Sequence, residues 1–265
     1  MRGQEVLFRV VADAQGGDVV AVGLQHSAGG VHDSDADPVP GVLCNDFPEG
    51  GGRVDGRVGG AASGLLAGSR LLLGAQNCGW ADGPWTGETA PSMLSELGVG
   101  LVEIGHAERR NHLGEDDAMI ARKVRAADAA GLPLLLCVGE LGAGTTADAA
   151  DFVFGQIETA VSGDWTLAAR LMVAYEPVWA IGAAEPAAAW YVSDVVRRLR
   201  GRLGATGVRA LPVIYGGSAK LRLLPTLDGV SGLFLGRFAH DPANFGKVLD
   251  EALALSLRAG PVPAR

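Results

Sequence analysis

The sequence predicts an α/β protein whose sheet closes into a single (β/α)8 barrel. From about residue 70 onward, short apolar segments alternate with helical segments, a pattern typical of a parallel sheet. The chain has 265 residues, which suits the roughly 250 that one such barrel needs. No repeat of 20–50 residues appears beyond this alternation. We therefore expect residues 1–265 to form one domain.

The elements follow from apolar runs and from helical spacing. Within 115–130, Ile120, Val124 and Ala127 recur at the spacing of one helix face. The helix at 187–203 ends in basic residues, which interact favourably with the C-terminal end of the helix dipole. Strands are expected at 70–76, 99–105, 133–138, 171–174, 212–215 and 232–236. Helices are expected at 91–97, 115–130, 147–161, 187–203 and 243–257.

The first 69 residues differ from the rest. Strand-like runs at 6–11, 19–22 and 39–44 are separated by segments rich in Gly, Asp and Pro, which break regular structure. Only 61–67 looks mildly helical. We expect an irregular or remodelled N-terminal quarter, with atypical first βα units, and not a separate domain.

Composition narrows the class of protein. No apolar run approaches the length of a membrane helix, and the N-terminus lacks the apolar core of a signal peptide. Cys44, Cys78 and Cys137 lie in apolar settings without metal-ligand spacing, so we expect reduced, mostly buried thiols in a cytoplasmic protein. The net charge of −8 argues against broad nucleic-acid binding. It leaves room for a small anionic substrate, because backbone amides bind phosphate locally.

The segment from Ala174 to Gly182 carries the first chemical signal. An apolar strand runs directly into Glu176, a proline follows, and small residues come next. A barrel enzyme holds its general base at the C-terminal end of a strand, ahead of a mobile loop. The alternative is an ordinary surface glutamate in a strand–helix turn.

Three other strand ends favour the general base. His106 follows the strand at 99–105 near a helix start, which disfavours its protonated form and suits a neutral hydrogen-bond donor. Gly216-Gly217-Ser218 and Gly236-Arg237 follow two later strands, where small residues let backbone N–H groups approach an anion. A barrel gathers such residues at one face.

These motifs resemble those of the triosephosphate isomerase family, over about residues 73–250. The matching segments are Gly74-Ala75-Gln76-Asn77, Trp85-Thr86-Gly87-Glu88, Gly105 to Arg110, Cys137-Val138-Gly139-Glu140, Ala174 to Gly182, and Tyr215-Gly216-Gly217-Ser218. Their order and spacing make the resemblance highly specific. It implies a TIM barrel and an isomerase that interconverts glyceraldehyde 3-phosphate and dihydroxyacetone phosphate without a cofactor or metal.

The resemblance also implies roles, which are known properties of that family and not deductions from this sequence. Glu176 would be the base that moves a proton between adjacent carbons. His106 would be the neutral electrophile, and Glu108 would lie close to the site. Residues 177–182 would begin the lid that excludes water.

Substrate binding and assembly are implied in the same way. The Gly182 amide and the Ser218 and Gly236 turns would hold the phosphate. The loop Trp85-Thr86-Gly87 would insert into a partner subunit, so a homodimer is implied.

The chain departs from the family at its first strand, where an Asn-x-Lys motif is usual. No lysine precedes Lys123, so the motif's lysine is absent. If the first strand is placed by counting back from Gln76-Asn77, His26 would replace this lysine. If the first strand is the run at 6–11, Arg9 or Asp13 would lie there instead. His26 is also explained as a solvated loop residue. A lost donor of this kind is typically worth roughly 3–4 kcal/mol, or about 100- to 1000-fold in rate.

Other departures lie near the predicted phosphate site. Arg237 replaces the second of two usual glycines, Ala183 to Ala187 replace the usual lid end, and Ala107 replaces a serine. Arg237 either binds the phosphate bidentately or points outward to pair with an acid.

Three functions fit these observations. The first is a triosephosphate isomerase, or a relative that acts on another short sugar phosphate. The second is a non-catalytic or weakly active homologue that binds a sugar phosphate or a protein partner. The third is aldol cleavage, which needs a Schiff-base lysine at a strand end or a bound metal. It ranks last because the sequence offers only the poorly placed Lys220 and no His/Asp/Glu cluster.

Overall fold

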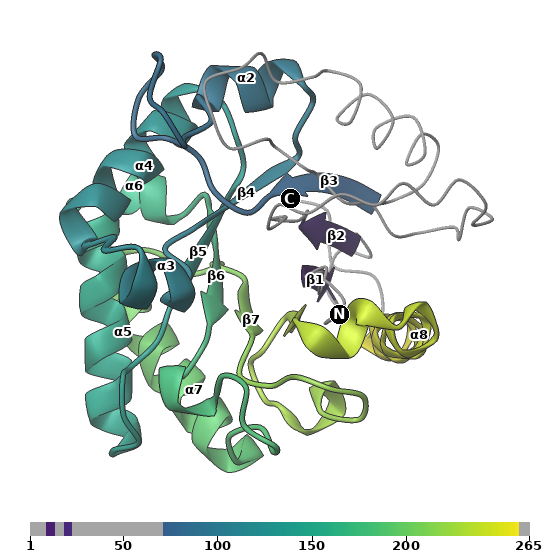
Figure 1. Ribbon diagram of the computed structural model, residues 1–265. Coiled ribbons are helices and arrows are strands. Elements are labelled where there is room, and N and C mark those ends of the chain that lie inside the picture. The colour runs from purple at the N-terminus through teal and green to yellow at the C-terminus, as the bar shows by residue number, and fades with distance from the viewer. Residues whose placement is uncertain (1–8, 14–18, 23–70, 260–265) are drawn as a thin grey trace, which may run out of the picture.

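The computed structural model describes residues 9–13, 19–22 and 71–259, whose strands form a closed barrel in sequence order (Figure 1). The strands are β1 (Arg9–Asp13), β2 (Val19–Val22), β3 (Leu71–Ala75), β4 (Leu101–Ile104), β5 (Leu134–Val138), β6 (Leu171–Tyr175), β7 (Val213–Tyr215) and β8 (Gly232–Leu235). Successive strands from β2 to β8 pair in parallel. The predicted (β/α)8 class is confirmed.

β1 is the exception, because it runs antiparallel to both β2 and β8. The chain has only five residues between β1 and β2, and a parallel connection needs a crossover of a dozen or more. Antiparallel pairing of β1 with β2 is therefore the arrangement that this chain length allows. The strand expected at 6–11 is found at 9–13, while residues 6–8, 39–44 and 61–67 lie outside the described ranges.

Helices cover the outside of the barrel, as α4, α5 and α7 do in Figure 1. The helices are α2 (Pro91–Glu96), α3 (Ala107–His112), α4 (Asp117–Ala129), α5 (Thr146–Ala160), α6 (Trp165–Ala168), α7 (Ala189–Ala205) and α8 (Pro242–Ala259). The side chains of Asp116 and Thr145 accept backbone N–H bonds at the starts of α4 and α5. Within the described ranges, none of the helices combines the length and the apolar character that a membrane span requires.

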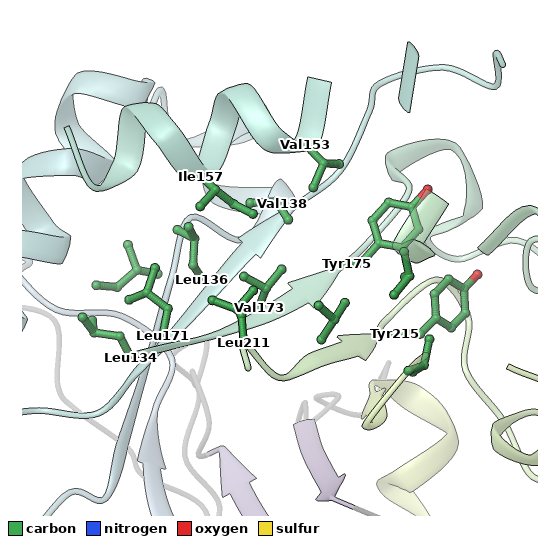
Figure 2. Packing of buried hydrophobic residues seen from close by; sticks show 14 of the residues in the cluster. Leu134, Leu136, Val138, Val153, Ile157, Leu171, Val173, Tyr175, Leu211 and Tyr215 are labelled. Carbon is green, nitrogen blue, oxygen red and sulfur yellow. The ribbon is translucent and has the colours of Figure 1, made fainter. Parts of the chain in front are cut away.

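Alternate residues of the strands face opposite sides of the barrel wall. On β5, Leu134, Leu136 and Val138 pack toward the helices, where Val153 and Ile157 of α5 meet them (Figure 2). Leu135 and Cys137 point the other way, into a small interior cluster. The interior cluster contains Leu101, Leu135, Cys137, Ala174, Ile214 and Phe234. This filled interior leaves the strand ends as the place for a site.

The described cysteines, Cys78 and Cys137, are buried, as the sequence predicts. Burial raises the pKa of the Cys78 thiol to about 12, so this thiol stays protonated. Cys44 lies outside the described residues.

A buried ion cluster ties the loop after β3 to α4. Lys123 of α4 is fully buried and bonds Glu115 and the Asn77 side-chain oxygen, the latter at 2.9 Å. Arg109 donates to the same Glu115 carboxylate at 2.6 Å and lies 3.5 Å from Glu88. The charges in this cluster compensate one another away from water.

Replacing Lys123 with Met will therefore destabilise the fold. The change leaves buried carboxylates with less positive charge, and we expect a loss of about 3 kcal/mol in the free energy of unfolding. Urea denaturation measures it, with Arg170→Ala as the control. Arg170 pairs with Asp128 at the surface, so its loss will cost less than about 1 kcal/mol. Equal losses of unfolding free energy in the two variants would contradict a stabilising role for the buried Lys123 charge.

Candidate active site

One cavity of about 920 Å³ lies where the strands end. Its lining includes seven of the residues that the sequence singles out: His106, Glu108, Glu176, Gly182, Ser218, Gly236 and Arg237. They come from the ends of β4, β6, β7 and β8 and from the segment after Glu176. His26, the eighth, lies outside the described residues. The structure brings these seven residues together around one cavity, and their roles stay predictions.

Glu176 is buried at the end of β6 and is fixed by two glycines. Its backbone N–H donates to the carbonyl of Val138 at 2.8 Å. A Cβ at Gly139 would overlap the Glu176 carbonyl, and a Cβ at Gly216 would lie 2.7 Å from its Cγ and 3.0 Å from Oε1. The backbone and the carboxylate of Glu176 are thus each pressed against a residue without a side chain.

Gln156 of α5 holds Gly139 in place. Its buried side-chain oxygen accepts the Gly139 N–H at 2.8 Å. The backbone carbonyl of Glu140, the residue after Gly139, accepts the Val178 N–H at 2.9 Å. The segment 138–140 is therefore a backbone cradle for 176–178. Gln156 is not among the residues predicted from the sequence, although it is a polar residue on the buried face of the helix expected at 147–161.

His106 faces Glu176 across the cavity. It caps the N-terminus of α3, and its Nδ1 accepts the Glu108 backbone N–H at 3.2 Å. An Nδ1 that accepts a hydrogen bond carries no proton, so the ring is neutral and its proton is on Nε2. Nε2 lies 3.5 Å from Oε1 of Glu176. The Glu108 side chain is exposed on the cavity wall, and its backbone orients His106.

Glu140 organises the segment that follows Glu176. Its buried carboxylate accepts hydrogen bonds from the Tyr175 hydroxyl at 3.1 Å, the Trp179 indole at 2.9 Å and the Tyr191 hydroxyl at 3.1 Å. Burial and the nearby Glu140 carboxylate raise the pKa of Tyr175 well above its usual value and that of Tyr191 to about 12. Both tyrosines therefore remain donors, and the end of β6, residue 179 and α7 are tied together.

The end of β7 and the loop that follows it hold both ends of the segment 180–187. The Ser218 hydroxyl donates to the Ala180 carbonyl at 2.8 Å, and the Ala187 N–H donates to the Tyr215 hydroxyl at 3.0 Å. Ser218 adopts a φ of 54°, which non-glycine residues rarely do. The segment that the sequence predicts as a lid is therefore anchored at its two ends, with its middle over the cavity.

Arg237 resolves the alternatives that the sequence left open. It lines the cavity, and its guanidinium lies 3.5 Å from the Gly182 carbonyl. The neighbouring acid, Asp241, instead accepts the Ala243 N–H at 2.9 Å at the start of α8. Within the described part of the chain, no carboxylate forms an ion pair with Arg237. The side chain faces the cavity and is paired with none of the acids that the structure describes.

This arrangement defines a class of enzyme. A buried carboxylate opposite a neutral N–H donor, at the strand ends of a barrel, suits proton transfer beside a carbonyl group. Comparison with known proteins agrees. The triosephosphate isomerase family model matches residues 60–252.

Individual relatives carry two names. An L-erythrulose-1-phosphate isomerase of Pectobacterium atrosepticum is 48% identical over 199 residues, covering 73% of this chain and 77% of the relative. One of Mesorhizobium japonicum is 40% identical, covering 71% and 78%. A triosephosphate isomerase of a Synechococcus species is 38% identical, covering 73% and 76%. The chain belongs to the triosephosphate isomerase family, and it is an isomerase of that family.

Adding a methyl group at Gly216 will disturb the base without unfolding the protein. In Gly216→Ala the new Cβ pushes against Glu176, and a displacement of about 1 Å at a reacting group can cost roughly 100-fold in kcat. Steady-state kinetics measures kcat, and thermal unfolding confirms the fold.

The matched control is Gly155→Ala in α5. A Cβ there meets no atom within 4 Å, and alanine favours a helix, so kcat should stay unchanged. A Gly216→Ala variant with wild-type kcat would contradict the steric role of Gly216.

Proposed function

We propose that this protein isomerises a short ketose phosphate by moving a proton between adjacent carbons, with L-erythrulose 1-phosphate as its principal substrate. The observation that carries the proton transfer is the pairing of Glu176 and His106, 3.5 Å apart in one cavity. The support for the substrate is the name of the relative that is 48% identical.

In the proposed reaction, Glu176 is the general base. L-Erythrulose 1-phosphate has its carbonyl at C2, and Glu176 removes the proton from C3. The electron pair of that C–H bond forms a C2–C3 double bond, and the negative charge that develops on the C2 oxygen is stabilised by Nε2–H of His106. The C2 oxygen gains a proton and the C3 hydroxyl loses one; return of the carbon-bound proton from Glu176 to C2, with formation of the carbonyl at C3, then completes the isomerisation.

The phosphate is proposed to lie at the β7 and β8 side of the cavity. The backbone amides of Gly182 and of the turns at Ser218 and Gly236 are the donors suited to it, and Arg237 lies beside them. Holding the phosphate away from the reacting carbons would let binding energy close the lid over the substrate and exclude water.

The triose phosphates are the second candidate substrates. Dihydroxyacetone phosphate differs from L-erythrulose 1-phosphate only by lacking a hydroxymethyl group on the carbon that loses its proton. The same base and donor would serve both compounds, and a relative named triosephosphate isomerase supports this alternative. The absence of the usual lysine predicts slow turnover, by about 100- to 1000-fold if nothing replaces that donor.

Isomerisation of both substrates by the wild type, Glu176→Ala and Glu158→Ala tests the proposal. Loss of the general base should lower kcat by roughly 100- to 10,000-fold. Glu158 is exposed on α5, so its variant controls for loss of a carboxylate elsewhere. We expect a higher kcat/KM for L-erythrulose 1-phosphate than for glyceraldehyde 3-phosphate.

Two outcomes would contradict parts of the proposal. A higher kcat/KM for the triose phosphate would make it the principal substrate. No turnover of either compound above the Glu176→Ala background would favour the non-catalytic, ligand-binding alternative.

A homodimer is also proposed, from the loop Trp85-Thr86-Gly87. Trp85 is 46% exposed and lies 5.2 Å from Trp80 between ring centroids, so this loop presents aromatic surface. Aromatic residues of this kind are enriched in the centres of interfaces. Analytical ultracentrifugation should find a dimer for the wild type and a monomer for Trp85→Glu. A monomeric wild type would overturn the proposal.

A further inference from the structure

We propose that Arg237 is the side chain that binds the substrate's phosphate group and that it couples the bound phosphate to the lid through residue Gly182. The inference rests on the proposed function only in taking the ligand to be a phosphorylated compound. It goes further by assigning phosphate recognition to a charged side chain at a position where the family usually has glycine.

Charge neutralisation distinguishes Arg237 from the other permanent cation on the cavity wall. Among the described lining residues, Arg237 and Lys220 carry permanent positive charges. Lys220 is paired with Glu185 at 2.6 Å, so its charge is already compensated. Arg237 touches a neutral carbonyl instead. Its charge is therefore available to an anion that enters the cavity.

The geometry of the guanidinium suits a phosphate dianion. Arginine presents several N–H donors in one plane and binds phosphate with two parallel, charge-assisted bonds. The contact with the Gly182 carbonyl is long, at 3.5 Å, and uses one terminal nitrogen. Within the part of the chain that the structure describes, the remaining donors form no other hydrogen bond, and the turns at Ser218 and Gly236 line the same cavity.

Gly182 links Arg237 to the lid. A Cβ at residue 182 would lie 3.1 Å from the Arg237 terminal nitrogen, and Gly182 has a φ of 72°, which disfavours other residues. The lid backbone therefore lies directly against the guanidinium. A phosphate bound by Arg237 would be covered by the same stretch of lid, so binding and closure share one side chain.

Titration calorimetry with inorganic phosphate tests the binding role. We expect Arg237→Gly, which restores the family's usual residue, to weaken phosphate affinity by about 10- to 100-fold. Arg237→Lys keeps the charge but loses the paired donors, so its affinity should be intermediate. The matched control is the double variant Lys220→Ala with Glu185→Ala, which removes a neutral ion pair and should change affinity less than about 3-fold.

Limited proteolysis tests the coupling to the lid. Phosphate should slow cleavage within 181–187 in the wild type. It should not do so in Arg237→Gly at a phosphate concentration that saturates the variant.

The outcomes separate this inference from the proposed function. Phosphate binding needs no proton transfer, so the titrations are repeated on the Glu176→Ala background, where affinity should be retained. Equal phosphate affinity in wild type and Arg237→Gly, or no phosphate binding by the wild type, would overturn the binding role. Equal lid protection at saturation would overturn the coupling. None of these outcomes depends on which sugar phosphate is isomerised.

Discussion

The position of the Glu176 carboxylate depends on two neighbours that have no side chain. Gly139 lets the β5 loop press against the Glu176 backbone, and Gly216 lets the β7 loop press against its carboxylate. Because both contacts are steric, they position the proposed base without using its carboxylate oxygens as hydrogen-bond acceptors. Gln156 of α5 holds the cradle by accepting the Gly139 N–H. Glu140, within the cradle, accepts the Trp179 indole N–H and so ties the cradle to the segment that leads to the lid.

The same loops organise the lid. Hydroxyl groups of Tyr215 and Ser218 hold its two ends, while Lys220 and Arg237 contact its middle. Lys220 is paired with Glu185, so Arg237 is the cation that presents positive charge to this cavity in a chain with a net charge of −8. Glu176, the proposed base, and Arg237, the proposed phosphate ligand, both line this one cavity.

The sequence predicted the barrel and most of the site because strand ends are local signals. An apolar run followed by Glu176 or His106 can be recognised within a few residues, and parallel strands bring such ends together. A helix start was expected near His106, but the range of α3 was not predicted, because its six residues are too few to show helical periodicity. The antiparallel direction of β1 was not predicted, because it depends on the number of residues between β1 and β2 and hence on where both strands begin and end.

Contacts between distant residues could not be predicted in the same way. The bond from Gln156 to Gly139 and the burial of Lys123 among Glu115 and Asn77 arise only once helices pack on the sheet. The direction of Arg237 was open for the same reason, since its choice between cavity and surface depends on where Gly182 and Asp241 lie. The geometry that tunes the site is tertiary, whereas the identity of its reacting groups is local.

The most direct test of the account is proton exchange in D2O, followed by NMR. Incubation of L-erythrulose 1-phosphate with the wild type should place deuterium at C3 of the recovered substrate and at C2 of the isomer that carries its carbonyl at C3, because Glu176 exchanges its proton with solvent while the intermediate exists. The Glu176→Ala variant should show no incorporation above the rate without enzyme. Equal incorporation by the two proteins would contradict the assignment of Glu176 as the base.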